Sequence, residues 1–362
     1  MSEQHWWPQV AIPLPQRRDY PIAIVGAGSI VNDAHLPAYR KAGFNVVGIF
    51  DRQPEKAYAT AARFALPAVY PSLEALLAGP AAIVDVAVPA RENLAIAQQV
   101  AEVGKALLIQ KPLAEDWVTA QAIATTVSNQ KIIAAVNQQA RWMPAVLAAR
   151  DLIERGLLGE IYQVSFLINV LTPWEQWPWI LQGATVEVMY HSIHYLDTVR
   201  AVLGMEPLLV FADGATLPGF PTRGETRTTI HLRFAGELRA TILDNHHNVW
   251  GVADHMATMR IEGTEGCIVA ELGLLKNYPV GVPDTFRYTS RHLHALTWIT
   301  PTLPGSWFPD AFIGTMASVM RGLEGEQGAP ETSLFDNLKT LRLVFAAYQA
   351  MAEHRAIPVA DQ

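Results

Sequence analysis

Apolar runs and helical patterns alternate regularly along the first part of the chain. Five short runs have the length and composition of buried strands, at residues 22–25, 46–50, 83–88, 106–109 and 132–136. Helical patterns lie between them, at residues 32–42, 54–64, 73–77, 93–103 and 117–127. Ser72 is the expected N-cap of the short helix at 73–77. This alternation predicts a parallel sheet covered by helices on both faces.

Beyond residue 144 the pattern changes. A helix is expected at 144–155, a strand at 161–168, a Trp-rich loop, and a helix at 186–203. Short turns then connect runs of strand character at 208–212, 226–234, 238–243, 256–262 and 267–271, and helices are expected at 310–323 and 334–354. Such closely spaced strands favour a mostly antiparallel sheet. We therefore expect a tail at 1–20, an α/β dinucleotide-binding domain at 21–140 and an α+β domain at 141–362 that binds substrate.

Composition supports two domains and excludes several classes of protein. The chain has 362 residues, of which 50% are hydrophobic, so it is not a largely disordered chain. Its net charge of −7 argues against nucleic acid or an anionic membrane as a partner. The single cysteine excludes an intrachain disulfide and a cysteine-based zinc site. No secretory pattern or long apolar span is found, which predicts a cytoplasmic protein.

A glycine-rich turn follows the first predicted strand. Residues 26–31 read Gly-Ala-Gly-Ser-Ile-Val. Gly26 permits a tight turn, and Gly28 allows the backbone to approach a pyrophosphate at the start of the next helix. Val31 stands where the usual fingerprint has a third glycine. A strand before the turn and a helix after it still favour dinucleotide binding.

An acidic residue at the end of the second strand indicates which dinucleotide is bound. Asp51 lies 23 residues after Gly28, close to the separation of about 20 expected for a carboxylate that binds a ribose hydroxyl. It favours NAD over NADP. Arg52 leaves the alternative open, because a guanidinium can accommodate a 2′-phosphate.

Two further segments carry candidate catalytic groups. Lys111 follows a buried strand, at the end of the sheet where ligands of open α/β sheets bind. Residues 187–197 place two histidines, Tyr190 and two acids near one side of an expected helix. Tyr190 and His194 are four residues apart and therefore share a helix face, with His191 close to it.

These motifs, in this order, resemble the glucose–fructose oxidoreductase / inositol dehydrogenase (Gfo/Idh/MocA) family. The similarity spans about residues 21–354. The glycine turn, Gln110-Lys111-Pro112 and the Tyr190/His194 pair correspond to the family's glycine turn, Glu-Lys-Pro tripeptide and Asp-x-x-x-His pair. The resemblance implies an N-terminal Rossmann domain, a second domain with a large open sheet, and a homodimer or homotetramer formed through that sheet.

The resemblance also implies the residues of the site. The expected cofactor-binding residues are Gly26, Gly28, Ser29, Ile30, Asp51, Arg52, Val88, Pro89, Asn93, Gln110 and Lys111. The expected substrate-binding residues are Lys111, Arg141, Trp174, Trp177, Tyr190, His191 and His194. Three positions depart from the family: Gln110 replaces Glu, Tyr190 replaces Asp, and Asn93 stands where His is common.

The predicted reaction is oxidation of a hydroxyl of a monosaccharide or polyol by NAD. His194 would take the hydroxyl proton and Lys111 would stabilise the developing alkoxide. Tyr190 would donate a hydrogen bond or act as an alternative base. No metal is expected in this site.

Three alternatives remain. Glu187, His191 and His194, with His246 or His247, have the spacing of a metal site, as in a metal-dependent isomerase or lyase. The family resemblance adds an NAD-dependent glycoside hydrolase and a sugar-sensing regulator without turnover.

Overall fold

The computed structural model describes residues 6–278, 281–293 and 297–359. The chain forms two compact units. The first unit comprises Ile12–Trp142 and Phe308–Lys339, and the second comprises Met1–Ala11, Met143–Trp307 and Thr340–Gln362. Among the described residues, no helix has the length and apolar character needed to cross a membrane.

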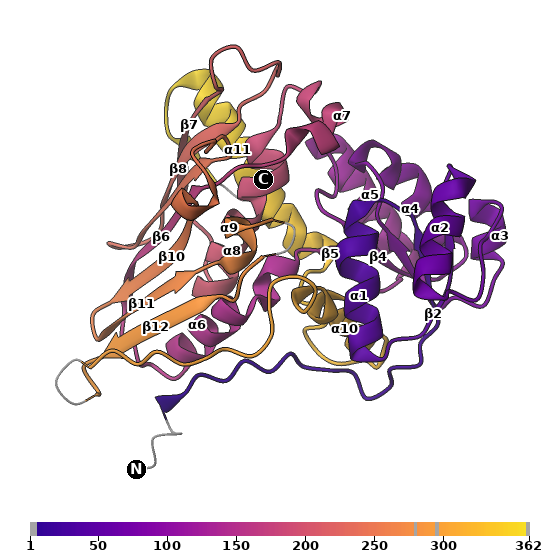
Figure 1. Ribbon diagram of the computed structural model, residues 1–362, viewed down its shortest axis with the longest axis horizontal. Coiled ribbons are helices and arrows are strands. Elements are labelled where there is room, and N and C mark those ends of the chain that lie inside the picture. Colours follow the sequence, from indigo (N-terminus) through magenta and orange to yellow (C-terminus); the bar gives the residue numbers. More distant parts are fainter. Residues whose placement is uncertain (1–5, 279–280, 294–296, 360–362) are drawn as a thin grey trace. The chain divides into compact units, whose positions relative to one another are not determined.

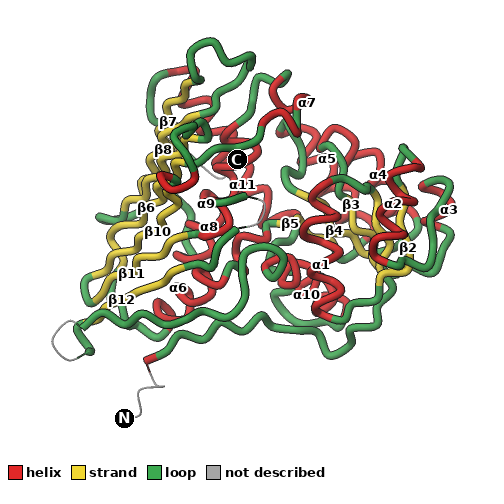
Figure 2. Tube along the Cα trace, viewed as in Figure 1, coloured by secondary structure: helices red, strands yellow, loops and turns green. Residues whose placement is uncertain are grey.

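The first unit is built on a parallel sheet (Figures 1 and 2). Its strands are β1 (Ile22–Val25), β2 (Val46–Phe50), β3 (Ile83–Val86), β4 (Ala106–Gln110) and β5 (Ala134–Asn137). Their spatial order is β2-β1-β3-β4-β5, and every neighbouring pair is parallel. The chain therefore leaves β1 toward β2 on one side and returns to β3 on the other. In a sheet of this type, the crevice at that change of direction is where ligands bind.

The connections of this sheet are helical, as the alternation predicts. The helices are α1 (Leu36–Ala42), α2 (Pro54–Phe64), α3 (Leu73–Leu77), α4 (Asn93–Glu102) and α5 (Trp117–Gln130). The Ser72 hydroxyl caps α3 by accepting the Ala75 N–H at 3.1 Å, as expected. A π-helical turn, Val31–His35, precedes α1, so the helix expected at 32–42 is not α-helical from its start.

A later helix, α10 (Ala311–Leu323), completes the first unit. Phe312, Met316 and Met320 are fully buried in one apolar cluster with Ile22 and Ile24 of β1. This helix thus covers the same face of the sheet as α1 and α2, which also contribute to the cluster.

Close packing of α10 explains why it belongs to this unit. A Cβ on Gly314 would lie 2.1 Å from the Trp142 ring, so only glycine allows the approach. The sequence-based division assigned everything after 140 to the second domain. The structure instead returns residues 308–339 to the first unit, because α10 has an apolar stripe that fits the uncovered sheet face.

The second unit contains an eight-stranded sheet. Its strands are β6 (Ile161–Asn169), β7 (Leu209–Ala215), β8 (Arg227–Arg233), β9 (Arg239–Asn245), β10 (Met256–Gly263), β11 (Gly266–Glu271), β12 (Thr285–Ser290) and β13 (Ile357–Pro358). The order is β12-β11-β10-β6-β9-β8-β7-β13, and all pairs are antiparallel except β6 with β9. The sheet is mostly antiparallel, as expected. The sequence did not predict β12, whose buried Phe286 and Tyr288 alternate with polar residues over only six positions.

The two faces of this sheet differ. Figure 1 shows α6 (Pro144–Glu154) and α8 (Ile193–Leu203) on one side of it, and Phe166 of β6 packs on Tyr195 of α8 with ring centroids 5.1 Å apart. The remaining helices of this unit are α7 (Pro178–Leu181), α9 (Gly273–Lys276) and most of α11 (Leu334–Glu353). On the opposite face, paired Leu167 and Leu243 remain 37% and 40% exposed. Within the described residues no helix covers that face.

Candidate functional site

The glycine turn of the first unit lies at the change of strand direction. Gly26 directly follows β1 and has φ +108°. A Cβ there would lie 2.3 Å from the Ala87 carbonyl oxygen, just after β3, so glycine is required. Gly28 is exposed, and a Cβ on it would meet no atom within 4 Å. The backbone of the turn is therefore closely packed at Gly26 and accessible to a ligand at Gly28. An accessible backbone before a helix is suited to binding a phosphate.

Asp51 is held beside this turn. Its two carboxylate oxygens accept the Ala27 N–H at 2.7 Å and the Gln53 N–H at 2.8 Å. A carboxylate accepts more than two hydrogen bonds, so capacity for a ribose hydroxyl remains. The neighbouring Arg52 is exposed and forms an ion pair with Glu92 at 3.4 Å.

The segment carrying Lys111 is supported from α4. Lys111 follows β4 at the same end of the sheet, and a cis peptide joins it to Pro112. The buried Asn93 side chain donates to the carbonyls of Pro112 and Leu113, at 3.3 and 3.0 Å. Asn93, expected to contact cofactor, thus shapes the loop after Lys111.

The other expected residues of this unit occupy different surroundings. Ser29 is exposed at the turn, and Ile30, Val88, Pro89 and Gln110 are half-buried. Arg141 is buried and forms an ion pair with Asp336 and a 3.1 Å hydrogen bond to the Glu331 carbonyl.

A buried polar cluster centred on Asp85 lies inside the first unit, between the sheet and α10. Asp85 Oδ2 accepts the Tyr39 hydroxyl at 2.8 Å and lies 2.7 Å from His35 Nδ1. The Asn137 amide lies 3.2 Å from His35 Nε2, and Thr315 of α10 donates to the Asn137 carbonyl oxygen at 2.7 Å. Because the Asn137 amide donates to Nε2, the proton of the ring is assigned to Nδ1 and points to Asp85.

In the second unit, the helix with the catalytic candidates begins irregularly. Residues Val188–Ser192 form a π-helical turn before α8. Such turns occur frequently at functional sites. The Tyr190 ring packs edge-on against Trp179, with centroids 5.6 Å apart, and the buried His194 ring packs edge-on against Trp307 at 5.9 Å.

The polar side chains of residues 187–197 contact different neighbours. Regular α-helical spacing would instead place them along one side of the helix. Asp197 is fully buried and accepts the Thr340 hydroxyl of α11 at 2.6 Å. His191 instead lies 3.1 Å from Glu187. The π-helical turn alters the angular spacing of side chains, which explains the departure.

Two tryptophans of the Trp-rich loop have different surroundings. Trp174 is buried, and its ring lies edge-on to His191 with centroids 5.1 Å apart. Trp177 is half-buried and lies 6.2 Å from Tyr278. Of the two, Trp174 is the one in contact with the histidines.

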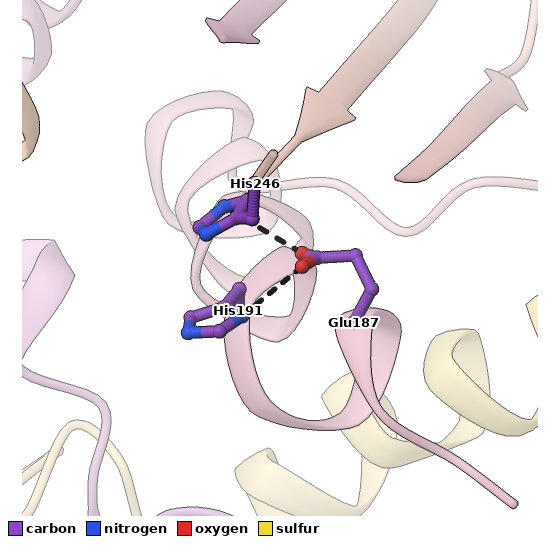
Figure 3. A group of neighbouring side chains, drawn as sticks. All are labelled: Glu187, His191 and His246. Carbon is purple, nitrogen blue, oxygen red and sulfur yellow. Dashed lines mark hydrogen bonds and ion pairs between the residues drawn. The ribbon is translucent and has the colours of Figure 1, made fainter. Parts of the chain in front are cut away.

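A group of three residues gathers where this helix meets the end of β9: Glu187, His191 and His246. Each offers one ligand-type atom, and these atoms lie within 4.8 Å of one another. Figure 3 shows both imidazoles beside the Glu187 carboxylate. The rings stack at 4.2 Å between centroids with 20° between their planes. We call this set the Glu187 cluster.

Sequence spacing identified this group only in part. It proposed His194 as a ligand with His246 or His247. The structure brings His246 to the cluster and leaves His194 against Trp307. His246 comes from a separate element, and the signal for it was its position just after a strand.

Further polar groups surround the Glu187 cluster. Asp244 Oδ1 lies 2.8 Å from His246 Nε2, and the Ser192 hydroxyl donates to Asp244 at 2.9 Å. Thr172 hydrogen-bonds to His246 Nδ1. Burial, followed by the neighbouring Asp244 carboxylate, raises the pKa of Glu187 well above its ordinary value.

Sequence comparisons assign both halves of the chain. The sequence model of an oxidoreductase family with an NAD-binding Rossmann fold, GFO_IDH_MocA, matches residues 20–138, and the GFO/IDH/MocA C-terminal domain matches residues 146–269. D-apiose dehydrogenase of Rhizobium rhizogenes is 26% identical over 93% of this chain and 96% of its own length. Inositol 2-dehydrogenase of Rhizobium meliloti is 25% identical over 93% of this chain and 98% of its own.

Solved structures show the same fold. Levoglucosan dehydrogenase in complex with NADH and levoglucosan superposes with a TM-score of 0.80 at 21% identity, covering 95% of this chain and 100% of that one.

Proposed function

The chain belongs to the Gfo/Idh/MocA family of NAD-dependent oxidoreductases, and we propose that it oxidises one hydroxyl of a monosaccharide or polyol. The observation that carries the proposal is its full-length similarity to the apiose and inositol dehydrogenases, together with a glycine turn and Asp51 placed where a dinucleotide fits. An apiose-like pentose, an inositol-like polyol and an anhydrosugar are all candidate substrates.

The residues of the first unit fit NAD. The open backbone at Gly28, with Ser29 and Ile30 after it, would receive the pyrophosphate, and Asp51 would accept a ribose hydroxyl. A 2′-phosphate would need a positively charged partner, and Arg52 already forms an ion pair with Glu92. This pairing supports NAD over NADP.

Other residues would line the cofactor site less directly. Val88 and Pro89 follow β3, and Gln110 ends β4, at the ligand-binding end of the sheet. Asn93 would act by holding the loop after Lys111.

The chemistry assigns a role to each catalytic candidate. When bound, NAD supplies the ring carbon that accepts the hydride. His194 takes the proton of the substrate hydroxyl, since an imidazole has the proton affinity for this task near neutral pH. Lys111 stabilises the negative charge that develops on that oxygen. Tyr190 donates a hydrogen bond to the substrate, in the position where the family has an aspartate.

Further residues of each unit are candidates for substrate contacts or for supporting them. Trp174 and Trp177 offer aromatic faces to the C–H groups of a sugar, and His191 offers a hydrogen bond. Arg141 is already bonded to Asp336 and Glu331, so it would orient the surrounding loop rather than move toward a ligand.

A panel of sugars and polyols with NAD and with NADP, followed by nicotinamide absorbance, tests the function. We expect reduction with at least one sugar and higher kcat/KM with NAD. Replacing His194 or Lys111 with Ala should lower kcat by about 100- to 10,000-fold, and Tyr190→Phe should separate hydrogen bonding from proton transfer. His292→Ala, on an exposed loop, is the control.

Two results would contradict the proposal. Turnover of His194→Ala close to that of the unmodified protein would remove His194 as the base. A panel without any reduction, in protein shown to bind NAD, would favour the glycosidase or regulator alternatives.

We also propose that the open face of the eight-stranded sheet forms a homodimer or homotetramer contact. Leu167, Leu243 and Phe211 stand on this face and are 37–44% exposed. Sedimentation of the double variant Leu167→Glu/Leu243→Glu should show a smaller species than the unmodified chain.

A further inference from the structure

The Glu187 cluster has the composition of a metal site. Two imidazoles and one carboxylate are the protein ligands of many catalytic zinc sites and of mononuclear iron(II) sites. Magnesium and calcium prefer oxygen ligands alone, so this donor set favours a transition metal. The three side chains come from one helix turn and from the residue after β9, so the fold holds them together without a mobile loop.

The distances suit a single ion. Around a tetrahedral zinc ion with bonds of about 2.1 Å, ligand atoms lie about 3.4 Å apart. Glu187 Oε2 lies 3.1 Å from His191 Nδ1, and Glu187 Oε1 lies 3.8 Å from His246 Nε2. One ligand-type atom of each residue lies within 4.8 Å of the other two, so side-chain rotations would be needed to bring all three to one ion.

Two buried groups at the cluster contact each other without a hydrogen bond. His246 Nε2 and Asp244 Oδ1 lie 2.8 Å apart as an ion pair, but neither atom makes a hydrogen bond within the described residues. Both side chains are at least 98% buried. Buried polar atoms are normally hydrogen-bonded, and a metal ion bound to His246 Nε2 would satisfy that nitrogen.

Charge points the same way. Glu187 and Asp244 are both buried, and across the described part of the chain no lysine or arginine forms an ion pair with either. Burying two carboxylates without a cation is costly. Their ion-pair partners are His191 and His246, which carry positive charge only when protonated, and a divalent cation would compensate the carboxylates with both rings neutral.

The surrounding residues have the roles found around bound metals. Metal-binding histidines are usually fixed through their second ring nitrogen. Thr172 bonds to Nδ1 of His246, which leaves Nε2 directed to the cluster. Ser192 donates to Glu187 at 3.3 Å and to Asp244 at 2.9 Å, and so orients both carboxylates.

We propose that Glu187, His191 Nδ1 and His246 Nε2 form a binding site for one divalent transition-metal ion, with Zn²⁺ the best-fitting ion. Three protein ligands leave a fourth coordination position for water or for an oxygen of a ligand. This site is additional to the proposed hydroxyl oxidation, in which the family reaction uses Lys111 and His194.

Zinc binding to untagged, EDTA-treated protein tests the site without measuring turnover. A competing chromophoric chelator should give one Zn²⁺ per chain with a dissociation constant of about 1 μM or below. His246→Asn and Glu187→Gln should each weaken binding by at least about 100-fold. His247→Asn, at the next position and outside the cluster, is the matched control and should retain binding.

Cobalt(II) provides a second measurement that does not depend on any variant folding. Co²⁺ added to the unmodified protein should produce the intense visible bands of a tetrahedral site with nitrogen ligands, and Zn²⁺ should abolish them. The proposal is overturned if the unmodified protein shows neither these bands nor stoichiometric zinc. It is also overturned if folded His246→Asn binds zinc as tightly as His247→Asn.

Discussion

Each unit of this protein buries histidine against carboxylate, with a different number of acidic groups. In the first unit, the single carboxylate of Asp85 receives two close donors, His35 and Tyr39, and the chain of contacts ends at Asn137 and Thr315. In the second unit, Glu187 of the Glu187 cluster and the neighbouring Asp244 place two carboxylates beside His191 and His246.

The comparison contrasts one buried carboxylate with a close pair of them. Asp85 Oδ1 and Asp244 Oδ1 both lack a hydrogen bond within the described residues, so an unsatisfied oxygen does not by itself distinguish the two groups. Burial alone does not distinguish the two cases, since Asp85 and Glu187 are both fully buried. The difference lies in the balance of donors, acceptors and charge.

The largest expected effect on stability is at the buried cluster centred on Asp85. Asp85→Asn replaces a carboxylate that accepts two hydrogen bonds and should lower the free energy of unfolding by about 3 kcal/mol, because bonds to a charged acceptor contribute about 1.5–3 kcal/mol each. Urea unfolding measures this. Asp213→Asn, on an exposed strand position, should change stability by less than about 0.5 kcal/mol. Equal stabilities of the two variants would contradict the structural role of Asp85.

A third carboxylate, Asp284, tests whether lack of partners is itself destabilising. Among the described residues it accepts a hydrogen bond only from the Gly273 N–H, at 2.7 Å, and burial raises its pKa from 3.8 to about 6. The folded chain therefore holds this proton more tightly than the unfolded chain does. The stability it contributes is complete below pH 3.8 and is lost as the pH rises through 6.

Asp284→Asn should therefore increase the free energy of unfolding at pH 7 by about 2 kcal/mol and flatten its decrease between pH 4 and 6. Thermal or urea unfolding across this pH range measures both effects. An unchanged pH profile would show that Asp284 does not titrate with a raised pKa.

The smallest effect should have the opposite sign to that of Asp85→Asn. Glu187→Gln removes one of two neighbouring buried carboxylates, so metal-free protein at pH 8 should gain about 1 kcal/mol. Exposed Glu175→Gln is the control for the same unit. If Glu187→Gln instead destabilises the protein as much as Asp85→Asn, Glu187 is an ordinary hydrogen-bonded partner and the contrast fails.

Local patterns predicted much of the fold. Strand–helix alternation in the first unit and the Ser72 cap could be derived from neighbouring residues, since short-range rules govern them. The π-helical turns at Val31–His35 and Val188–Ser192 could not, because they shift spacing without a residue-level marker. The packing of α10 on the first unit depends on which sheet face has no other helix over it. The periodicity of the helix alone does not specify that face.

The candidate site was predictable to the same degree. Gly26 and Asp51 follow from their positions at strand ends, and the structure places them at one turn. For the Glu187 cluster, the sequence favoured a site without metal, and its metal alternative combined Glu187, His191 and His194 with His246 or His247. To identify His246 as the member of the cluster, one must know the register of β9 and the face of the sheet on which Asp244 lies. Both depend on the pairing of β9 with β6 and β8.

The position of α10 also bears on how the protein is synthesised. During translation the strands of the first unit are complete by residue 137, but the helix that covers one face of them is made more than 170 residues later. Until then Ile22 and Ile24 lack part of their cover. A nascent chain, or a fragment ending near residue 142, would present an apolar surface to chaperones and to other chains. The first unit therefore has its strands early but is completed only near residue 339, after most of the second unit has been made.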